Sequence, residues 1–201
     1  MGCDIHLMAE VRKNGKWKKV EGEFYDDRNY ELFAILADVR NRFGIKPICQ
    51  PKGFPDNTYQ DLDFFDGTHS ASYFTVQEIL EYDWTQTCVA SGNIPLYQYL
   101  RWKRWGKNQG ENPSEFNQGV SGQNVKILDT SEADKIDLEH SKTYSYPNEA
   151  YIEQKYPSHY VRAEWTRTYY AECSDFLSEC LPQLWRLGKP EDVRIVFSFD
   201  N

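Results

Sequence analysis

Two segments, one near each end of the chain, alternate hydrophobic and polar residues in the pattern of a half-buried β-strand. From Cys3 to Arg12 the odd positions are apolar and most even positions are polar, and Val193 to Phe199 alternates in the same way. Asn14-Gly15 follows the first segment and precedes a second short strand pattern, Lys16 to Val20. A strand, an Asn-Gly pair and another strand predict a β-hairpin.

Between these two strand patterns, apolar residues recur at helical spacing in several segments. Apolar residues from about 29 to 42 recur every three or four positions, and Thr75-Val76-Gln77-Glu78 is a capping box that opens a short helix through Tyr82. A longer helix is predicted from Val161 to Leu181, with Trp165 on its apolar stripe, and Pro182 should kink or end it. Further patterns predict a strand over 85–90 and a helix over 95–105.

Strands at both ends with helices between them predict a single α+β domain over 1–201. We expect a mixed or antiparallel sheet that contains the N-terminal hairpin and the C-terminal strand and packs against the helices. The stretch around 106–160 is rich in polar residues and reads as an irregular or inserted loop region.

Composition narrows the function classes. The 201 residues carry a net charge of −8, which disfavours a surface for duplex nucleic acid, and no apolar run approaches the roughly 18 residues of a membrane span. The five cysteines are odd in number and form no CxxC pair, so we expect a reducing, cytoplasmic location. Aromatic residues make up 15% of the chain and nearly equal Leu, Ile and Val together in number, so we expect some of them to belong to the core and others to a binding pocket.

The first strand places Asp4, His6 and Glu10 on one face. One interpretation is a solvated sheet face, on which these residues need no special role. The other is a cleft in which Asp4 and His6, two positions apart, share a proton or a ligand.

A second candidate is the loop from Asp66 to Tyr73, which carries His69 and Ser70. With Asp4 and His6 it could supply an acid/base pair, or two histidines and two carboxylates for a divalent metal. No HExxH or comparable spacing supports a metal, so we predict no cofactor and keep a metal as the weaker alternative.

Arginine beside amide and aromatic residues is the third candidate. Arg28-Asn29-Tyr30 and Arg40-Asn41 flank the first predicted helix. Arginine binds phosphate in a bidentate manner and aromatic rings stack on bases, so this mixture suits a small nucleotide ligand, although packing could equally explain it. The candidate ligand-binding residues are Asp4, His6, Arg28, Asn29, Tyr30, Arg40, Asn41, His69, Ser70, Tyr73 and Trp84.

Several of these motifs together resemble a family of small phage and prophage proteins. The resemblance rests on the opening MGCDIH, on RNY followed by LFAILADVRN, and on the closing VRIVFSFDN. Small phage accessory proteins often resemble counter-defence factors, some of which bind or cleave nucleotide signals of host immunity. By that likeness the ligand would be a cyclic dinucleotide or an ADP-ribose derivative, and the location the host cytoplasm.

Three functions therefore stand as hypotheses. The first is a binding protein that sequesters a small nucleotide-derived signal. The second is a hydrolase, most simply a phosphodiesterase, with His6 or His69 as acid or base and Asp4 or Asp66 as its partner. The third is an inhibitor that binds another protein through an aromatic surface around Trp102 and Trp105. A homo-oligomer is a further expectation, because small ligand-capturing proteins often build their pockets between subunits.

Overall fold

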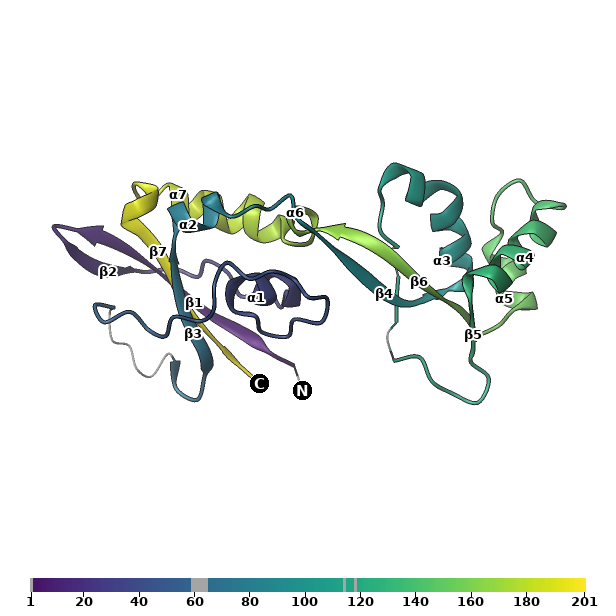
Figure 1. Ribbon diagram of the computed structural model, residues 1–201, viewed down its shortest axis with the longest axis horizontal. Helices are drawn as coiled ribbons and strands as arrows, with labels where there is room; N and C mark the ends of the chain where they lie inside the picture. The colour runs from purple at the N-terminus through teal and green to yellow at the C-terminus, as the bar shows by residue number, and fades with distance from the viewer. Residues whose placement is uncertain (1, 59–64, 114, 118) are drawn as a thin grey trace. The chain divides into compact units, whose positions relative to one another are not determined.

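The computed structural model describes residues 2–58, 65–113, 115–117 and 119–201, and these residues divide into two compact units (Figure 1). The first unit comprises 1–88 together with 168–201, and the second comprises 89–167. The second unit contains the 106–160 stretch that the sequence predicts to be irregular or inserted. The protein combines helices with mainly antiparallel sheet, so the predicted α+β class is confirmed.

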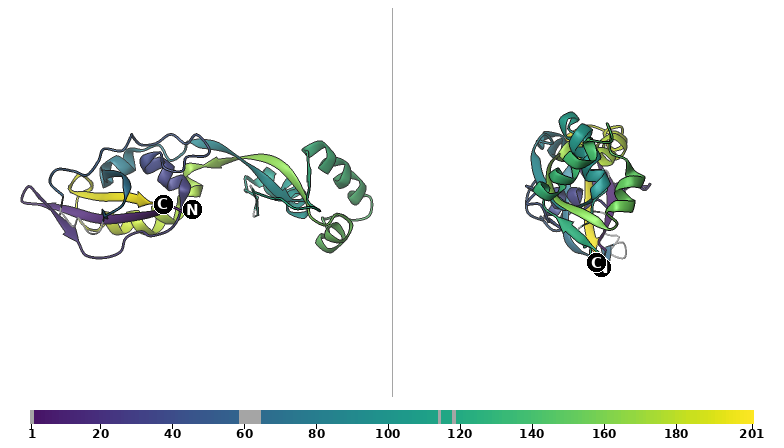
Figure 2. Two further views of the ribbon diagram at one scale, coloured as in Figure 1. Left: turned by 90° about the horizontal axis from the view of Figure 1, so that it is seen from below. Right: turned by 90° about the vertical axis from the view of Figure 1, so that its right-hand side faces the viewer.

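The first unit is built around a four-stranded antiparallel sheet in the order β2-β1-β7-β3. Its elements are β1 (Asp4–Lys13), β2 (Lys16–Val20), α1 (Tyr30–Ala37), β3 (His69–Thr75), α2 (Val76–Glu81), α6 (Tyr169–Glu172), the π-helical η4 (Phe176–Cys180), α7 (Leu181–Trp185), the 3-10 helix η5 (Pro190–Asp192) and β7 (Val193–Asp200). The predicted hairpin and terminal strand are therefore present and belong to one sheet. The β1–β7 register pairs Asp4 with Asp200 and Val11 with Val193, which brings the two chain ends together (Figure 2).

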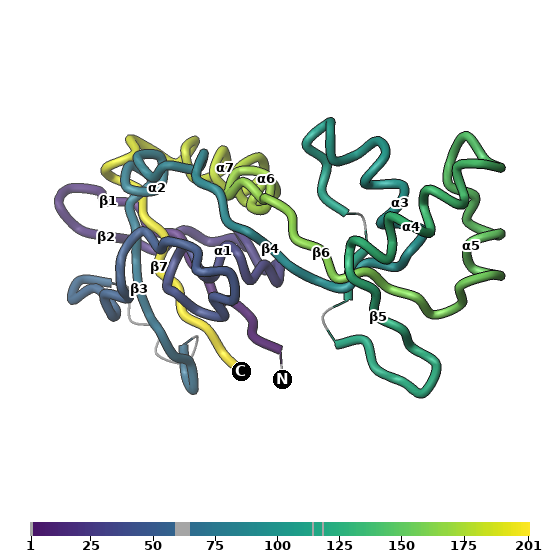
Figure 3. Tube along the Cα trace, turned by 45° about the vertical axis from the view of Figure 1, so that its right-hand side comes forward, coloured from purple at the N-terminus to yellow at the C-terminus, as the bar shows by residue number. Residues whose placement is uncertain are grey.

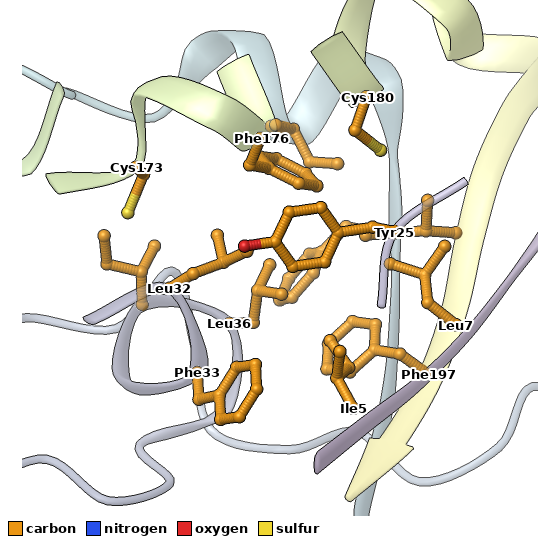
Figure 4. Packing of buried hydrophobic residues seen from close by; sticks show 14 of the residues in the cluster. Ile5, Leu7, Tyr25, Leu32, Phe33, Leu36, Cys173, Phe176, Cys180 and Phe197 are labelled. Atoms are coloured by element: carbon orange, nitrogen blue, oxygen red, sulfur yellow. The ribbon is translucent and has the colours of Figure 1, made fainter. Parts of the chain in front are cut away.

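One face of this sheet forms the hydrophobic core. The apolar odd-numbered residues of β1 and β7 pack against α1 and the C-terminal helices. Figure 4 shows the Tyr25 ring between Phe176 and Phe197, and its centroid lies 5.5 Å from that of Phe176 in an edge-on contact. Aromatic rings thus fill much of the space between sheet and helices, which accounts for part of the aromatic excess in the sequence.

The opposite face is covered at Glu10. This carboxylate is fully buried and accepts a 2.7 Å hydrogen bond from Nε of Arg194, whose side chain is also buried. Thr58 donates its hydroxyl to the other carboxylate oxygen at 2.8 Å. A solvated face, the simpler interpretation of the sequence, is therefore wrong at this position, because the loop that contains Thr58 lies over it.

Helix α1 is shorter than its apolar pattern predicts. It begins after Asn29, whose side chain accepts the backbone N–H of Leu32, and it ends before Asp38, which adopts a left-handed conformation with φ of 58°. The apolar spacing continues past Asp38, but a left-handed residue stops the helical hydrogen bonds. The capping box at Thr75 and Glu78 is present as predicted and opens α2.

The long helix predicted over 161–181 is wrong in its first half. Residues His159–Thr168 form strand β6, in which Val161, Ala163 and Trp165 are buried and the residues between them are exposed. A spacing of four between Val161 and Trp165 fits either a helix or a strand, so the pattern was ambiguous. Helical structure starts at Tyr169 and runs through α6, η4 and α7, and Pro182 lies just after the π-helical η4, where the helix continues to Trp185 instead of ending.

The second unit contains a three-stranded sheet in the order β4-β6-β5. Its elements are β4 (Thr87–Pro95), α3 (Leu96–Arg101), the π-helical η2 (Trp102–Gly106), the 3-10 helix η3 (Lys107–Gln109), β5 (Lys126–Leu128), α4 (Thr130–Ser141), α5 (Glu149–Lys155) and β6. Trp102 is buried and donates its indole N–H to the carbonyl of Glu111 at 2.7 Å, whereas Trp105 is 45% exposed. Only one of the two tryptophans is thus available on the surface of this unit.

Candidate functional site

Polar side chains gather where the two chain ends meet in the first unit. Because β1 and β7 are antiparallel, the start of one strand lies beside the end of the other, and Figure 3 shows the two termini as neighbours. The residues gathered there come from both ends of the chain and from the segments that flank α1. We call them the terminal cluster, and they are Asp4, His6, Arg28, Arg40, Asp200 and Asn201.

Asp4 and Arg28 form the outer part of this cluster. The guanidinium holds the carboxylate in a bidentate manner, with Nε to Oδ1 at 2.8 Å and Nη2 to Oδ2 at 2.7 Å. Both side chains are about half exposed. Gly2 lies so close that a Cβ on it would be 2.6 Å from a guanidinium nitrogen, so no other residue fits there without moving Arg28.

His6 is bonded to Asp200, a residue that the sequence did not single out. Nε2 of His6 lies 3.1 Å from Oδ2 of Asp200, and Oδ1 of the same carboxylate accepts the backbone N–H of Asp4 at 3.2 Å. The hydrogen bond from His6 lowers the pKa of Asp200, and the charge of Arg28 acts in the same direction. The sequence offered Asp4 or Asp66 as the partner of His6, and Asp4 instead binds Arg28.

Arg40 joins the two chain ends. Its Nη2 donates to the carbonyl of Gly2 at 3.2 Å and to Oδ1 of Asn201 at 2.7 Å. The backbone of Arg40 is left-handed, with φ of 54°, a conformation that is unfavourable for a residue with a Cβ. The surrounding structure therefore holds this arginine in a strained position with its guanidinium directed at the termini.

Three of the predicted ligand-binding residues have structural roles. The amide of Asn29 caps α1 and donates to the carbonyl of Glu172 at 2.7 Å. The amide of Asn41 bonds both the N–H and the carbonyl of Ile45. The indole N–H of Trp84 donates to the carbonyl of Ile79 at 2.9 Å. These contacts hold loops and helices in place, which explains the residues without a ligand.

The two predicted tyrosines lie against cations. Tyr30 packs on Phe33 and has the guanidinium of Arg42 5.7 Å from its ring centroid. Nζ of Lys52 lies 4.3 Å from the ring centroid of Tyr73. The guanidinium of Arg194 lies 5.5 Å from the same centroid. Neither ring belongs to the terminal cluster.

His69 reaches the same end of the sheet but on the other face. It pairs with Phe199 across β3 and β7 and packs near that ring, whereas His6 pairs with Ser198. Residues paired across strands share a face and successive residues alternate, so the sheet separates the two histidines. Nδ1 of His69 lies 3.0 Å from the hydroxyl of Ser70, and its buried Nε2 has no hydrogen-bond partner among the described residues.

The remaining predicted residue, Asp66, is exposed in the turn before β3. Within the ranges that the structure describes, no three His, Cys, Asp or Glu side chains are grouped so as to hold a metal. Asp4, His6, Asp66 and His69 therefore do not assemble into the two-histidine, two-carboxylate site considered from the sequence. None of the helices in those ranges combines the length and apolarity needed to cross a membrane.

A cavity of about 380 Å³ lies beside the first half of β1. The segment after β2 forms its other wall, and most of the charged groups around it are acidic. Its lining residues are Asp4, Ile5, His6, Leu7, Met8, Lys19, Glu21, Gly22, Glu23, Tyr25 and Asp26. The terminal cluster therefore opens at one end onto a space large enough for part of a small molecule or a short peptide.

Comparison with known proteins adds no further constraint. No protein-family model, curated protein or solved structure matches this chain.

Proposed function

We propose that this protein binds and sequesters a small, phosphate-bearing, nucleotide-derived ligand at the terminal cluster. The observation that supports this most directly is the convergence of Arg28, Arg40 and His6 at one end of the sheet, although they come from three separate segments. Arginine and histidine supply the N–H donors that phosphate oxygens accept. The strained backbone of Arg40 also fits a functional role, because strain of this kind collects at functional sites.

The ion pair between Asp4 and Arg28 would not prevent phosphate from binding. Both side chains are about half exposed, and exposed pairs contribute only about 0–1 kcal/mol. A phosphate can therefore take over or share the guanidinium at little cost. The resemblance to phage proteins supports a cyclic dinucleotide or an ADP-ribose derivative as the ligand, a counter-defence role, and action in the host cytoplasm.

The test is calorimetric titration with two probes, cyclic di-GMP and ADP-ribose. We expect Arg28→Gln and Arg40→Gln each to weaken binding at least tenfold, because a hydrogen bond to a charged group contributes about 1.5–3 kcal/mol. Arg186→Gln, an exposed arginine of α7's C-terminal end, is the matched control and should bind like the wild type. Ligand released by heating should be chemically unchanged.

Two results would refute the proposal. The proposal loses its basis if neither probe binds at millimolar concentration. Equal affinities for Arg28→Gln and Arg186→Gln would place any binding elsewhere.

The contact between His6 and Asp200 favours one second candidate, a phosphodiesterase. A carboxylate bonded to one ring nitrogen orients a histidine so that its other nitrogen can accept or donate a proton. This function predicts altered ligand after incubation, and a loss of turnover of about a hundredfold or more in His6→Ala. Because His69 lies on the other face of the sheet, His69→Ala should retain turnover, and a large loss in that variant would contradict the assignment to His6.

A further inference from the structure

Strand β1 is paired differently along its two halves. Residues 9–13 pair with β2 on one side, and residues 4–11 pair with β7 on the other. The ladder to β2 stops at Ala9, which faces Val20. Among the residues that the structure describes, no strand pairs with Asp4–Met8 on the β2 side, so this stretch is an open sheet edge although β1 as a whole lies between two strands.

The hairpin turn determines which backbone groups point toward this open edge. Asn14 and Gly15 both have positive φ, as a two-residue turn of the primed type requires, and such a turn closes on a hydrogen-bonded pair, here Lys13 and Lys16. Hydrogen-bonding direction alternates along an antiparallel strand, so the odd residues of β1 face β2 and its extension. Ile5 and Leu7 thus direct their N–H and C=O groups outward, and these groups have no hydrogen bond to another described residue.

The cavity of about 380 Å³ lies along this edge. Ile5 and Leu7 line it from β1, and the segment from Glu21 to Asp26 lines it from the opposite side. The side chains of Ile5 and Leu7 point into the hydrophobic core and are buried, so these two residues meet the cavity with their backbone. An open edge inside a groove of this kind is the usual setting for strand addition by a peptide.

The charges around the groove indicate what kind of strand fits. Three acidic residues that line the groove, Glu21, Glu23 and Asp26, are exposed. Lys19 also lines it and carries a positive charge. Asp4 is largely offset by Arg28. A second copy of this chain would bring the same acidic wall against itself, so charge disfavours pairing between copies and favours a basic segment.

We infer that the edge Asp4–Met8 binds an extended, lysine- or arginine-bearing segment of a partner protein as an added β-strand. At about 3.3 Å per residue, about five residues of the partner would span this edge. Backbone hydrogen bonds to Ile5 and Leu7 supply the pairing, and the acidic wall selects basic side chains. This inference does not depend on the nucleotide ligand proposed above.

The test uses acetyl-Lys-Val-Lys-Val-Lys-amide and two forms with methylated backbone nitrogens. One form is methylated at the two valines, and the other is methylated at the second and third lysines. In an added strand, alternate residues face the sheet edge, so methylation of the facing set removes donors and blocks close approach, whereas methylation of the other set does neither. We expect one form to lose about tenfold or more in affinity and the other to bind like the parent. The amides of Ile5 and Leu7, followed by NMR, should exchange more slowly when the parent peptide is bound.

Charge is tested with matched triple variants. Three exposed ion pairs contribute about 0.2–1 kcal/mol each, so Glu21→Gln/Glu23→Gln/Asp26→Asn should weaken the parent peptide about tenfold at low salt. The control Glu115→Gln/Glu153→Gln/Glu164→Gln removes the same charge from exposed positions of the second unit and should bind like the wild type. Arg28→Gln separates the two proposals. It should weaken nucleotide binding, but it leaves the charge of Asp4 without its arginine partner and so should strengthen peptide binding by about twofold.

Four outcomes would overturn the inference. The first is equal binding of both methylated peptides, which would exclude strand pairing. The second is a peptide that binds without slowing amide exchange at Ile5 and Leu7. The third is no peptide binding up to millimolar concentration. The fourth is a protein dimer that the peptide displaces, detected by sedimentation, which would assign the edge to a second copy.

Discussion

The buried ion pair between Glu10 and Arg194 should be among the most sensitive points of the first unit. The two side chains are 0% and 6% exposed, with Nη2 of Arg194 2.6 Å from Oε2 of Glu10. Arg194→Met removes the cation and leaves the carboxylate in a place that solvent does not reach. Breaking a buried pair in this way costs about 3–5 kcal/mol. At a urea dependence of about 2 kcal/mol/M, the midpoint of unfolding should fall by about 2 M.

Arg12→Met is a closely matched control. Arg12 also binds a carboxylate, with Nη2 2.6 Å from Oδ1 of Asp192, and its guanidinium also lies over the ring of Trp17. The difference is burial, because the Arg12 and Asp192 side chains are 43% and 31% exposed. An exposed pair contributes about 0–1 kcal/mol, so the expected shift in the urea midpoint is at most about 0.5 M.

Far-UV circular dichroism follows both unfolding transitions without relying on Trp17. Adding Glu10→Gln to Arg194→Met should restore part of the lost stability, because it removes a buried charge that has lost its arginine partner. The reasoning is refuted if Arg194→Met is no more destabilising than Arg12→Met, or if Glu10→Gln makes the Arg194→Met protein still less stable.

Two further predictions concern the terminal cluster and the thiols. The pKa of Asp200 is lowered in the folded protein by the hydrogen bond from His6, so its ionised form stabilises the fold above the unfolded pKa of 3.8, and this contribution is lost as pH falls through the lower folded value. Asp200→Asn should therefore lower the urea midpoint at pH 6, with a smaller difference from the wild type at pH 3, and a difference that does not shrink would contradict this. Cys49 is partly exposed, whereas burial raises the pKa of Cys180 to about 12, and Cys3, Cys88 and Cys173 are also buried. Ellman's reagent should label one thiol of the native protein and five in urea, and rapid labelling of a Cys49→Ser protein would show that this ranking is wrong.

Local signals in the sequence were sufficient for several elements. The Asn14-Gly15 turn and the capping box at Thr75 were predicted correctly, because each depends on interactions between residues within four positions. The helix predicted across Val161 to Leu181 was wrong in its first half. The same buried positions fit two periods there, and pairing of β6 with β4 and β5 selects the strand.

The residues of the candidate site also differ in whether the sequence alone could identify them. Asp4, His6, Arg28 and Arg40 were identified from residue type and neighbourhood, and the structure brings all four into the terminal cluster. Asp200 and Asn201 were missed, although aligning the two terminal alternations as antiparallel partners would have placed Asp200 opposite Asp4. Asn29, Asn41 and Trp84 were assigned to a ligand because sequence alone cannot show that a polar group already has a partner within the fold.

Residue order alone predicts which side chains of the first strand share a face, because that follows from the two-residue period of a β-strand. What each of those faces contacts depends on the folded chain as a whole. His6 bonds a residue 194 positions away, Glu10 is buried under a loop 48 positions away, and β1 keeps an open edge where β2 ends. These outcomes depend on which distant backbone packs beside the strand, and that choice results from the burial of the whole core rather than from any local pattern.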